Sequence, residues 1–483
     1  MRKHNIKQSV RFFLVFVILA FSSCTDWLTV SPEDKLIKGK FWKKTSDVNS
    51  ALAATYDAIR DASMKSLIFG ELRADLVTFP GSSFTDYAKI ASSDISPTNG
   101  VVSWKSYYTA INLANTLMYF DKVVYGLDKT FTKKMMDGVD AEALFIRSLS
   151  YFYLVRIWKD VPLVLEPSIS DTSSLYLPTS SEYIVINQII EDLLKAKDIA
   201  YTNEFRGSDY FYGRANKFSI MALLADVYLW NQQYQKCIDY CDSVSIQGGY
   251  QLEPSDTWFN IYYPGNSINE SIIEIQYDDN LQQNNPIYDN LMSVSGGTQL
   301  AMNTKNIGLL LDKEDLRNYS TKYGVWKYRG KDGLGLESRT INERDANWII
   351  YRYADIMLMK AEACTELNRF DDANALITET MLRAGMPHEV ASDKEILRKA
   401  VLDERGREFL LEGKRWFDLL RAAKRNNFEN KQLIINMILS GAGIQQQAIL
   451  RTKVYDTLSY YLPIAEHELI YNQNLKQNPF YDR

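Results

Sequence analysis

The sequence contains few of the residues that build metal sites or disulfide frameworks. Only 4 cysteines and 3 histidines occur among 483 residues. No two cysteines stand at CxxC spacing, and the segment that begins at His388 lacks the second histidine of an HExxH motif. A zinc site and a disulfide-stapled fold are therefore not expected.

The chain also lacks an excess of positive charge. Lys and Arg number 55 against 60 Asp and Glu, the formal net charge is −5, and no run of basic residues occurs. Proteins that bind nucleic acids need cations to neutralise phosphates, so nucleic-acid binding is not expected. The composition is otherwise that of a globular protein, with 46% hydrophobic and 13% aromatic residues. Such a chain can build a large core without a metal or disulfide.

The longest apolar run near the N-terminus is too short to cross a bilayer. Four basic residues and no acid precede ten apolar residues, Phe12 to Phe21, which are followed by Ser22-Ser23-Cys24. A spanning helix needs about 20 apolar residues, so this run is the core of a signal peptide. The segment resembles a bacterial lipoprotein signal, in which the cysteine is acylated and becomes the first mature residue. We expect residues 1–23 to be removed, Cys24 to carry lipid and residues 24–40 to form a tether. In the alternative, the signal is a plain one and Cys24 is unmodified.

Helical periodicity dominates the rest of the chain and predicts a mostly α protein. Thr45 or Ser46 is expected to cap a first helix with a core stripe beginning at Val48. Further helices are expected at 346–384 and 394–425, whereas Gly, Asn, Asp and Pro interrupt the segment between them, with short strands such as 271–276. One domain is expected over 41–483, in four parts: N-terminal helical (41–245), loop-rich and ligand-binding (246–345), helical repeat (346–425) and C-terminal tail (426–483).

Two segments that are far apart in the chain repeat one pattern of small and large residues. In each, a small residue (Ala225 or Ala361) stands three residues before a larger one, and a second helix brings another small residue nine residues later. This spacing is typical of tetratricopeptide helix pairs, whose small residues let the helices approach closely. It predicts a tetratricopeptide-like helix-pair superhelix, with Cys237, Cys241 and Cys364 in its core.

Three glutamates raise the question of catalysis. Glu404, Glu408 and Glu412 follow one another at i, i+4 and i+8 in a helix expected over 404–421, a spacing compatible with the separation of about 5–5.5 Å in a retaining glycosidase pair. Interleaved Arg and Lys residues would keep these carboxylates ionised, so we predict a structural ion-pair network instead. No serine-hydrolase elbow, phosphate loop or dinucleotide loop occurs, so neither an enzyme nor a cofactor is expected. Asp278-Asp279-Asn280 lacks the EF-hand spacing, and structural calcium is unsupported.

Several stretches resemble the SusD/RagB family, the nutrient-binding outer-membrane lipoproteins of Bacteroidetes-type bacteria. They occur in order along the chain, at 104–115, 141–163, 269–275, 351–363, 404–419, 462–464 and 474–479. Gly406 replaces a usual Arg and Lys414 a usual His. The resemblance implies a lipid-anchored, surface-exposed outer-membrane protein that binds an oligosaccharide and delivers it to a SusC-like TonB-dependent transporter. A peptide ligand is the first alternative, and a glycoside hydrolase or a pure protein scaffold are the others.

A sugar-binding surface needs aromatic rings for the apolar faces of sugars, and amides or charged groups for the hydroxyls. We therefore singled out polar and aromatic residues in and beside the loops, and assigned Trp104, Trp158, Trp348 and Trp416 to the core. The candidate ligand residues are Arg73, Asp75, Phe84, Tyr87, Asn285, Tyr288, Trp326 and Tyr328.

Overall fold

A computed structural model of the protein describes residues 41–79, 85–169, 176–204, 210–262, 269–286, 300–318, 326–329 and 344–482. Cys24, the signal peptide and the tether therefore lie outside the described residues, as do Phe84 and Tyr288. Within the described residues, no helix is both long and apolar enough to cross a membrane.

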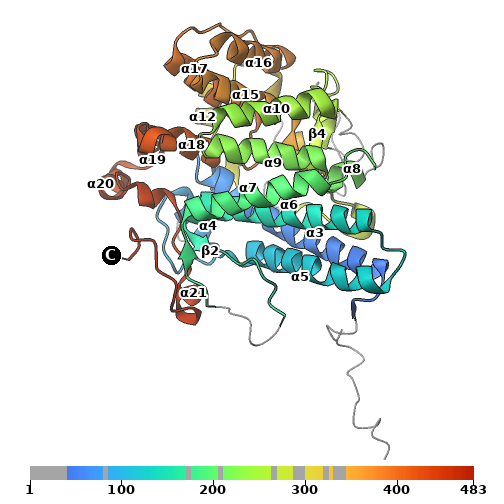
Figure 1. Ribbon diagram of the computed structural model, residues 1–483. Helices are drawn as coiled ribbons and strands as arrows, with labels where there is room; N and C mark the ends of the chain where they lie inside the picture. Colours follow the sequence, from blue (N-terminus) through green and yellow to red (C-terminus); the bar gives the residue numbers. More distant parts are fainter. Residues whose placement is uncertain are drawn as a thin grey trace, which may run out of the picture.

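The body of the molecule is a stack of α-helices, each packed against the next (Figure 1). This confirms the predicted mostly α, tetratricopeptide-like architecture. The helices of the stack are α3 (Thr45–Leu67), α5 (Lys105–Leu127), α6 (Lys133–Trp158), α7 (Glu182–Ile199), α9 (Lys217–Trp230), α10 (Tyr234–Gly248), α15 (Tyr353–Glu366), α16 (Phe370–Arg383) and α17 (Lys394–Glu408).

The two predicted repeat units are the helix pairs α9/α10 and α15/α16. Their turns are built alike, because Gln232 (φ 57°) and Asn368 (φ 60°) both adopt the left-handed conformation at equivalent positions of the two repeats. At the next position in each turn, the backbone N–H groups of Gln233 and Arg369 donate to carbonyls five residues earlier, each over 2.8 Å. The three cysteines of these helices are buried and free, as predicted.

The first helix begins where expected but is not capped by Thr45 or Ser46. Thr45 is already the first helical residue, and both its backbone N–H and its hydroxyl donate to Asp128 Oδ2 over 2.8 Å. Its side chain therefore ties α3 to the end of α5 instead of closing its own helix. The predicted core stripe is confirmed, since Val48, Leu52 and Ile59 are buried.

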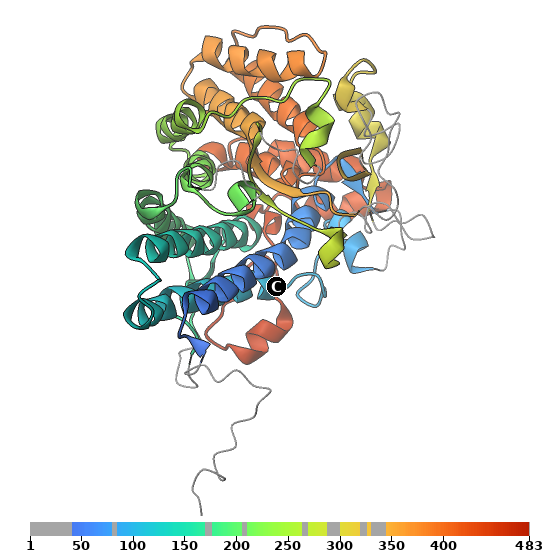
Figure 2. The same ribbon diagram turned by 90° about the vertical axis from the view of Figure 1, so that its right-hand side faces the viewer.

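The remaining elements are short, and the helices of residues 304–310 and 326–329 (yellow) lie beside the stack at the right of Figure 2. The short elements include three two-stranded antiparallel sheets, β1 (Val77–Thr78) with β5 (Ala301–Met302), β2 (Val161–Pro162) with β3 (Thr179–Ser180), and β4 (Ser271–Ile275) with β6 (Trp348–Arg352). The helix expected from residue 346 begins later than predicted, because residues 348–352 form the strand β6. Pairing with β4 holds these residues extended until α15 begins at Tyr353. The short helices are η2 (Ile68–Leu72), α4 (Asp86–Ala91), α8 (Tyr210–Gly213), η3 (Trp258–Tyr262), η4 (Asp279–Leu281), α12 (Thr304–Leu310), η5 (Leu316–Asn318) and α14 (Trp326–Arg329).

The single helix expected over 404–421 is broken in two. α17 ends at Glu408 and α18 (Arg415–Phe428) begins seven residues later, because Leu411 and Gly413 adopt positive φ angles of 66° and 72°. The tail that follows is largely helical. It holds α19 (Gln432–Gly441), α20 (Ile444–Lys453), η6 (Thr457–Tyr460) and α21 (Glu466–Tyr471).

Candidate functional site

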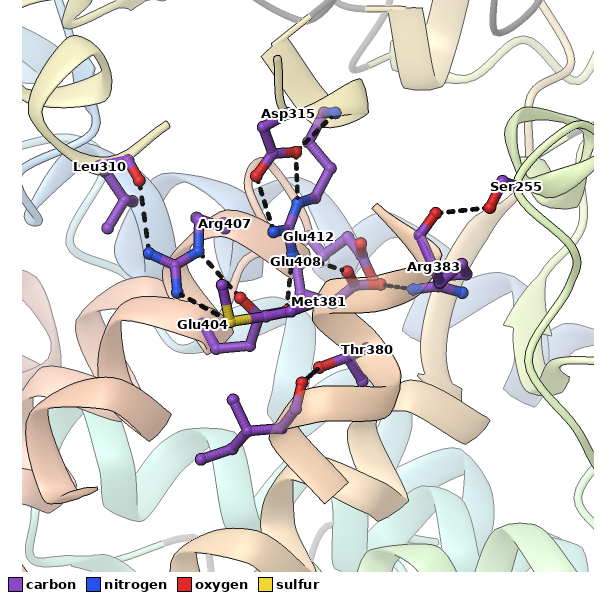
Figure 3. Close-up of polar contacts among 12 residues, drawn as sticks. Ser255, Leu310, Asp315, Thr380, Met381, Arg383, Glu404, Arg407, Glu408 and Glu412 are labelled. Carbon is purple, nitrogen blue, oxygen red and sulfur yellow. Dashed lines mark hydrogen bonds and ion pairs between the residues drawn. The ribbon is translucent and has the colours of Figure 1, made fainter. Parts of the chain in front are cut away.

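Glu404, Glu408 and Glu412 lie in the core, each in contact with cations from other segments. Figure 3 shows Arg383 beside Glu408 and Arg407 beside Glu404. Arg317 Nη1 contacts Glu404 at 2.8 Å, Arg352 Nη1 contacts Glu408 at 2.6 Å, and Lys327 Nζ contacts Glu412 at 2.6 Å. We call these six residues, together with Arg383, which also pairs with Glu408, the glutamate cluster. The predicted structural ion-pair network is thus confirmed.

The glutamate cluster has neither the proton nor the access that a general acid needs. Burial by itself raises the pKa of Glu412, but Arg352 and Lys327 outweigh it and lower that pKa to about 2. The cations Arg383, Arg352 and Arg317 likewise lower the pKa of Glu408 against the effect of burial. All three carboxylates are therefore ionised at neutral pH and closed off from a substrate.

A close backbone contact fixes the segment that leads to Arg73 and Asp75. A Cβ atom placed on Gly70 would lie 2.0 Å from the carbonyl oxygen of Gly413. Gly413 in turn needs its positive φ, which L-residues rarely adopt. Gly413 thus permits a close approach of the backbone to the π-helix η2.

Two candidate ligand residues lie in the core instead of on the surface. Tyr328 is 1% exposed and its hydroxyl donates to the Leu411 carbonyl over 2.8 Å. Asn285 is fully buried and donates to the Ala346 carbonyl over 2.7 Å. The expectation that these loop residues face a ligand is not met, because their loops fold inward onto the glutamate cluster and β6.

Two further candidates, Tyr87 and Trp326, lie in short helices. Tyr87 is half-buried in α4, with its ring stacked on Phe79 at 6.0 Å between centroids. Trp326 opens α14. The four tryptophans assigned to the core are all buried, as predicted: Trp104, Trp158, Trp348 and Trp416.

The structure brings Arg73 and Asp75 together in one small pocket of about 100 Å³, which we call the Arg73 pocket. It lies where the end of η2, β1, the end of α4, the start of α12 and the α19–α20 connection meet. Its lining includes Arg73, Asp75, Ser92, Ser93, Asn303, Asn306, Gly441, Ala442 and Gln446.

Arg73 is a buried cation that pairs with no carboxylate among the described residues. Its side chain is 3% exposed, and its guanidinium lies 4.0 Å from the centroid of the Trp416 ring. Among the described residues, Nε and Nη1 have no hydrogen-bond partner. Burial lowers the pKa of Arg73 to about 10, so the group is still charged at neutral pH. The neighbouring Asp75 is already paired with Arg415, whose Nε and Nη2 contact its two oxygens at 2.8 and 2.9 Å.

A larger hollow of about 610 Å³, which we call the Tyr108 groove, lies between the start of α5, the segment around Tyr176 and α21. Tyr176 and Tyr471 at its rim are 60% and 75% exposed. Its other polar lining residues are Lys105, Tyr108, Thr109, Asn112, Glu468 and Asn472. Two amides hold the rim together, because Asn472 and Asn474 donate to the carbonyls of Leu177 and Tyr176.

The sequence patterns did not indicate the Tyr108 groove. Its walls come from segments that are distant in the chain, and no local pattern reports that they meet. The one available signal was a pair of tyrosines, Tyr176 and Tyr471, in segments with weak helical periodicity.

Comparisons with known proteins agree on one family. A family model described as "SusD family" matches residues 218–481, and another, "Starch-binding associating with outer membrane", matches residues 26–229. The chain is 26% identical to "SusD-like protein P38" of Formosa agariphila, over 86% of this chain and 91% of that protein. It is 24% identical to a SusD-like protein of Bacteroides ovatus, over 83% of this chain and 80% of the relative.

Solved structures share the fold. A SusD superfamily protein from Bacteroides vulgatus superposes with a TM-score of 0.74 at 21% identity, covering 91% of this chain and 100% of that one. A laminarin-binding SusD-like protein superposes with a TM-score of 0.72 at 22% identity, also over 91% of this chain and 100% of its own.

Proposed function

This chain belongs to the SusD family, and on that premise we propose that it is an outer-membrane lipoprotein that binds an oligosaccharide and passes it to a TonB-dependent transporter. The observation that carries the proposal is the family match over residues 218–481. The laminarin-binding SusD-like protein, which has the same fold over 91% of this chain, supports a glycan as the ligand.

The Tyr108 groove has the chemistry that a sugar ring needs. Tyr176 and Tyr471 expose flat rings for the C–H faces of sugars, and the Nδ2 of Asn112, whose Oδ1 accepts from the Ser168 N–H, can donate to a hydroxyl. A volume of about 610 Å³ lies within the range of small-ligand sites. We therefore propose that the sugar rings bind in the Tyr108 groove.

The proposal is of binding without turnover. The carboxylates that resemble a glycosidase pair are buried and ionised in the glutamate cluster. Attachment through Cys24 would hold the protein beside its transporter, where a high effective concentration makes modest affinity sufficient.

Isothermal titration of the purified chain against laminarin oligosaccharides and a panel of other glycans tests the proposal. We expect saturable binding to at least one glycan, weakened at least tenfold by Tyr471→Ala. Tyr183→Ala is the matched control, because Tyr183 is 71% exposed on α7, outside the groove. Binding to peptides and to no glycan would contradict the proposal and favour the peptide-binding alternative.

A further inference from the structure

We propose that the Arg73 pocket binds an anionic substituent, a carboxylate or a sulfate ester, carried by the oligosaccharide. This inference rests on the proposed function, because it takes the anion to be part of a glycan. It adds to that function a ligand class, acidic or sulfated sugars, and a second contact point apart from the Tyr108 groove.

The first argument is the missing counter-charge. A charged group taken out of water costs free energy unless it is paired and hydrogen-bonded. Arg73 is 3% exposed, and the part of the chain that the structure describes supplies its guanidinium with no carboxylate and leaves two of its nitrogens unbonded. The Trp416 ring beneath it stabilises a cation but accepts no hydrogen bond of the kind a carboxylate does.

The two acids that flank Arg73 in the chain are engaged elsewhere. Both oxygens of Asp75 are held by Arg415. Glu71, two residues before Arg73, accepts from the N–H groups of Gly413 and Lys414 over 2.8 and 3.1 Å. Burial raises the pKa of Glu71 to about 8, so its carboxyl group is mostly neutral at pH 7. The charge of Asp75 is offset by Arg415, which leaves the positive charge of Arg73 without a carboxylate partner among the described residues.

Other groups around the Arg73 pocket also suit an anion. Ala442 and Gln446, which line it, flank the start of the ten-residue helix α20, whose first N–H groups have no partner within the helix. Such helix starts carry partial positive charge and favour carboxylates and sulfates. Ser92, Ser93 and the Asn303 amide add hydroxyl and amide groups to the wall.

The size of the Arg73 pocket sets which part of a sugar can enter. A volume of about 100 Å³ holds several water molecules, so it accepts a carboxylate or sulfate group. The sugar ring that bears the group stays at the mouth. A planar guanidinium fork matches either group with two parallel hydrogen bonds.

The test compares matched ligand pairs on the full purified chain by isothermal titration. One pair is an oligoglucuronate and its carboxyl-reduced form; the other is a sulfated galactan oligosaccharide and its desulfated form. We expect at least tenfold tighter binding of one anionic member than of its neutral counterpart, weakening as salt rises. Which pair shows the preference distinguishes a carboxylate from a sulfate.

Variants of Arg73 then test whether the preference for the anionic ligand arises in the Arg73 pocket. Arg73→Gln should abolish it while leaving affinity for the neutral member within twofold, and Arg73→Lys should keep part of it. Arg451→Gln is the matched control, because Arg451 is an exposed cation on the same helix α20. A preference that survives Arg73→Gln would overturn the inference.

If Arg73→Gln fails to fold, titration of the wild-type chain with the matched ligand pairs still tests the inference. Equal affinity for the anionic and neutral members of both pairs would overturn the anionic subsite and leave the proposed function standing. Absence of binding to every glycan would contradict the proposed function itself.

Discussion

The glutamate cluster and the Arg73 pocket both bury arginine, but only the cluster supplies its arginines with acids. Arg352 is fully buried and contacts Glu270 and Glu408 at 2.6 Å and Glu412 at 3.0 Å. Arg73 is almost as deeply buried and rests on an indole ring, and no acid in the described ranges pairs with it. A complete set of partners marks a structural residue, whereas a missing partner marks a place that a ligand can complete.

The largest expected effect comes from removing a cation of the glutamate cluster. Arg352→Met would leave three buried carboxylates without their shared partner, so we expect it to lower the free energy of unfolding by about 3–5 kcal/mol. Urea denaturation measures this loss. A loss below about 1 kcal/mol would mean that the cluster does not carry the structural role given to it here.

The next largest loss of stability is expected at the close backbone contact between Gly70 and Gly413. Gly70→Ala would place a Cβ atom 2.0 Å from the Gly413 carbonyl oxygen, so we expect a loss of about 1–3 kcal/mol from overpacking. Gly126→Ala in α5 is the control, because a Cβ atom there meets nothing within 4 Å. That helical position should gain up to about 1 kcal/mol. Equal effects at both glycines in thermal unfolding would refute the close contact.

A third site, the neighbouring carboxyl groups of Asp121 and Asp140, is buried like the glutamate cluster, but the lysine beside it, Lys122, does not offset the cost of burial. Burial and the neighbouring carboxylate of Asp140 raise the pKa of Asp121 to about 8. The folded chain therefore keeps a proton that an unfolded aspartate releases near pH 4, and the free energy of unfolding falls as pH rises from about 4 to about 8.

Asp121→Asn removes this titration. We expect the variant to become more stable than the wild type on the order of 1–2 kcal/mol at pH 8, with the difference vanishing toward pH 4. Urea denaturation at pH 5, 6, 7 and 8 checks it. A stability difference that is constant across this range would contradict the raised pKa.

The smallest change in the free energy of unfolding is expected for a substitution of Arg73, whose pairing differs most from that of Arg352. Arg73→Met loses the contact with Trp416, worth about 0.5–2 kcal/mol, but also relieves an unpaired buried charge. The two contributions oppose each other, so the free energy of unfolding should change by less than about 1 kcal/mol. A loss as large as that of Arg352→Met would place Arg73 among the structural arginines.

Local sequence patterns predicted the parts of the fold that depend on local spacing. The two repeated helix pairs, the buried tryptophans and the ion pairing of Glu404 and Glu408 all follow from periodicity and neighbouring charges. The break after Glu408 was missed, because it serves a contact with Gly70 in a distant part of the chain.

Contacts between distant parts of the chain also explain why only some of the candidate ligand residues lie where the sequence predicted. Loop composition suggested that Tyr328 is exposed, but the adjacent Lys327 pairs with Glu412, 85 residues along the chain, and draws the segment into the core. Arg73 and Asp75 were singled out as polar residues near a loop. Only the structure shows that one is paired and the other is not.

The measurement that tests the central claim most directly is titration of the purified chain with oligosaccharides, followed by mass spectrometry of the recovered ligand. The account predicts saturable binding of at least one glycan and a ligand that is recovered at its original mass. Shorter fragments generated by the pure protein, or no binding to any glycan, would contradict it.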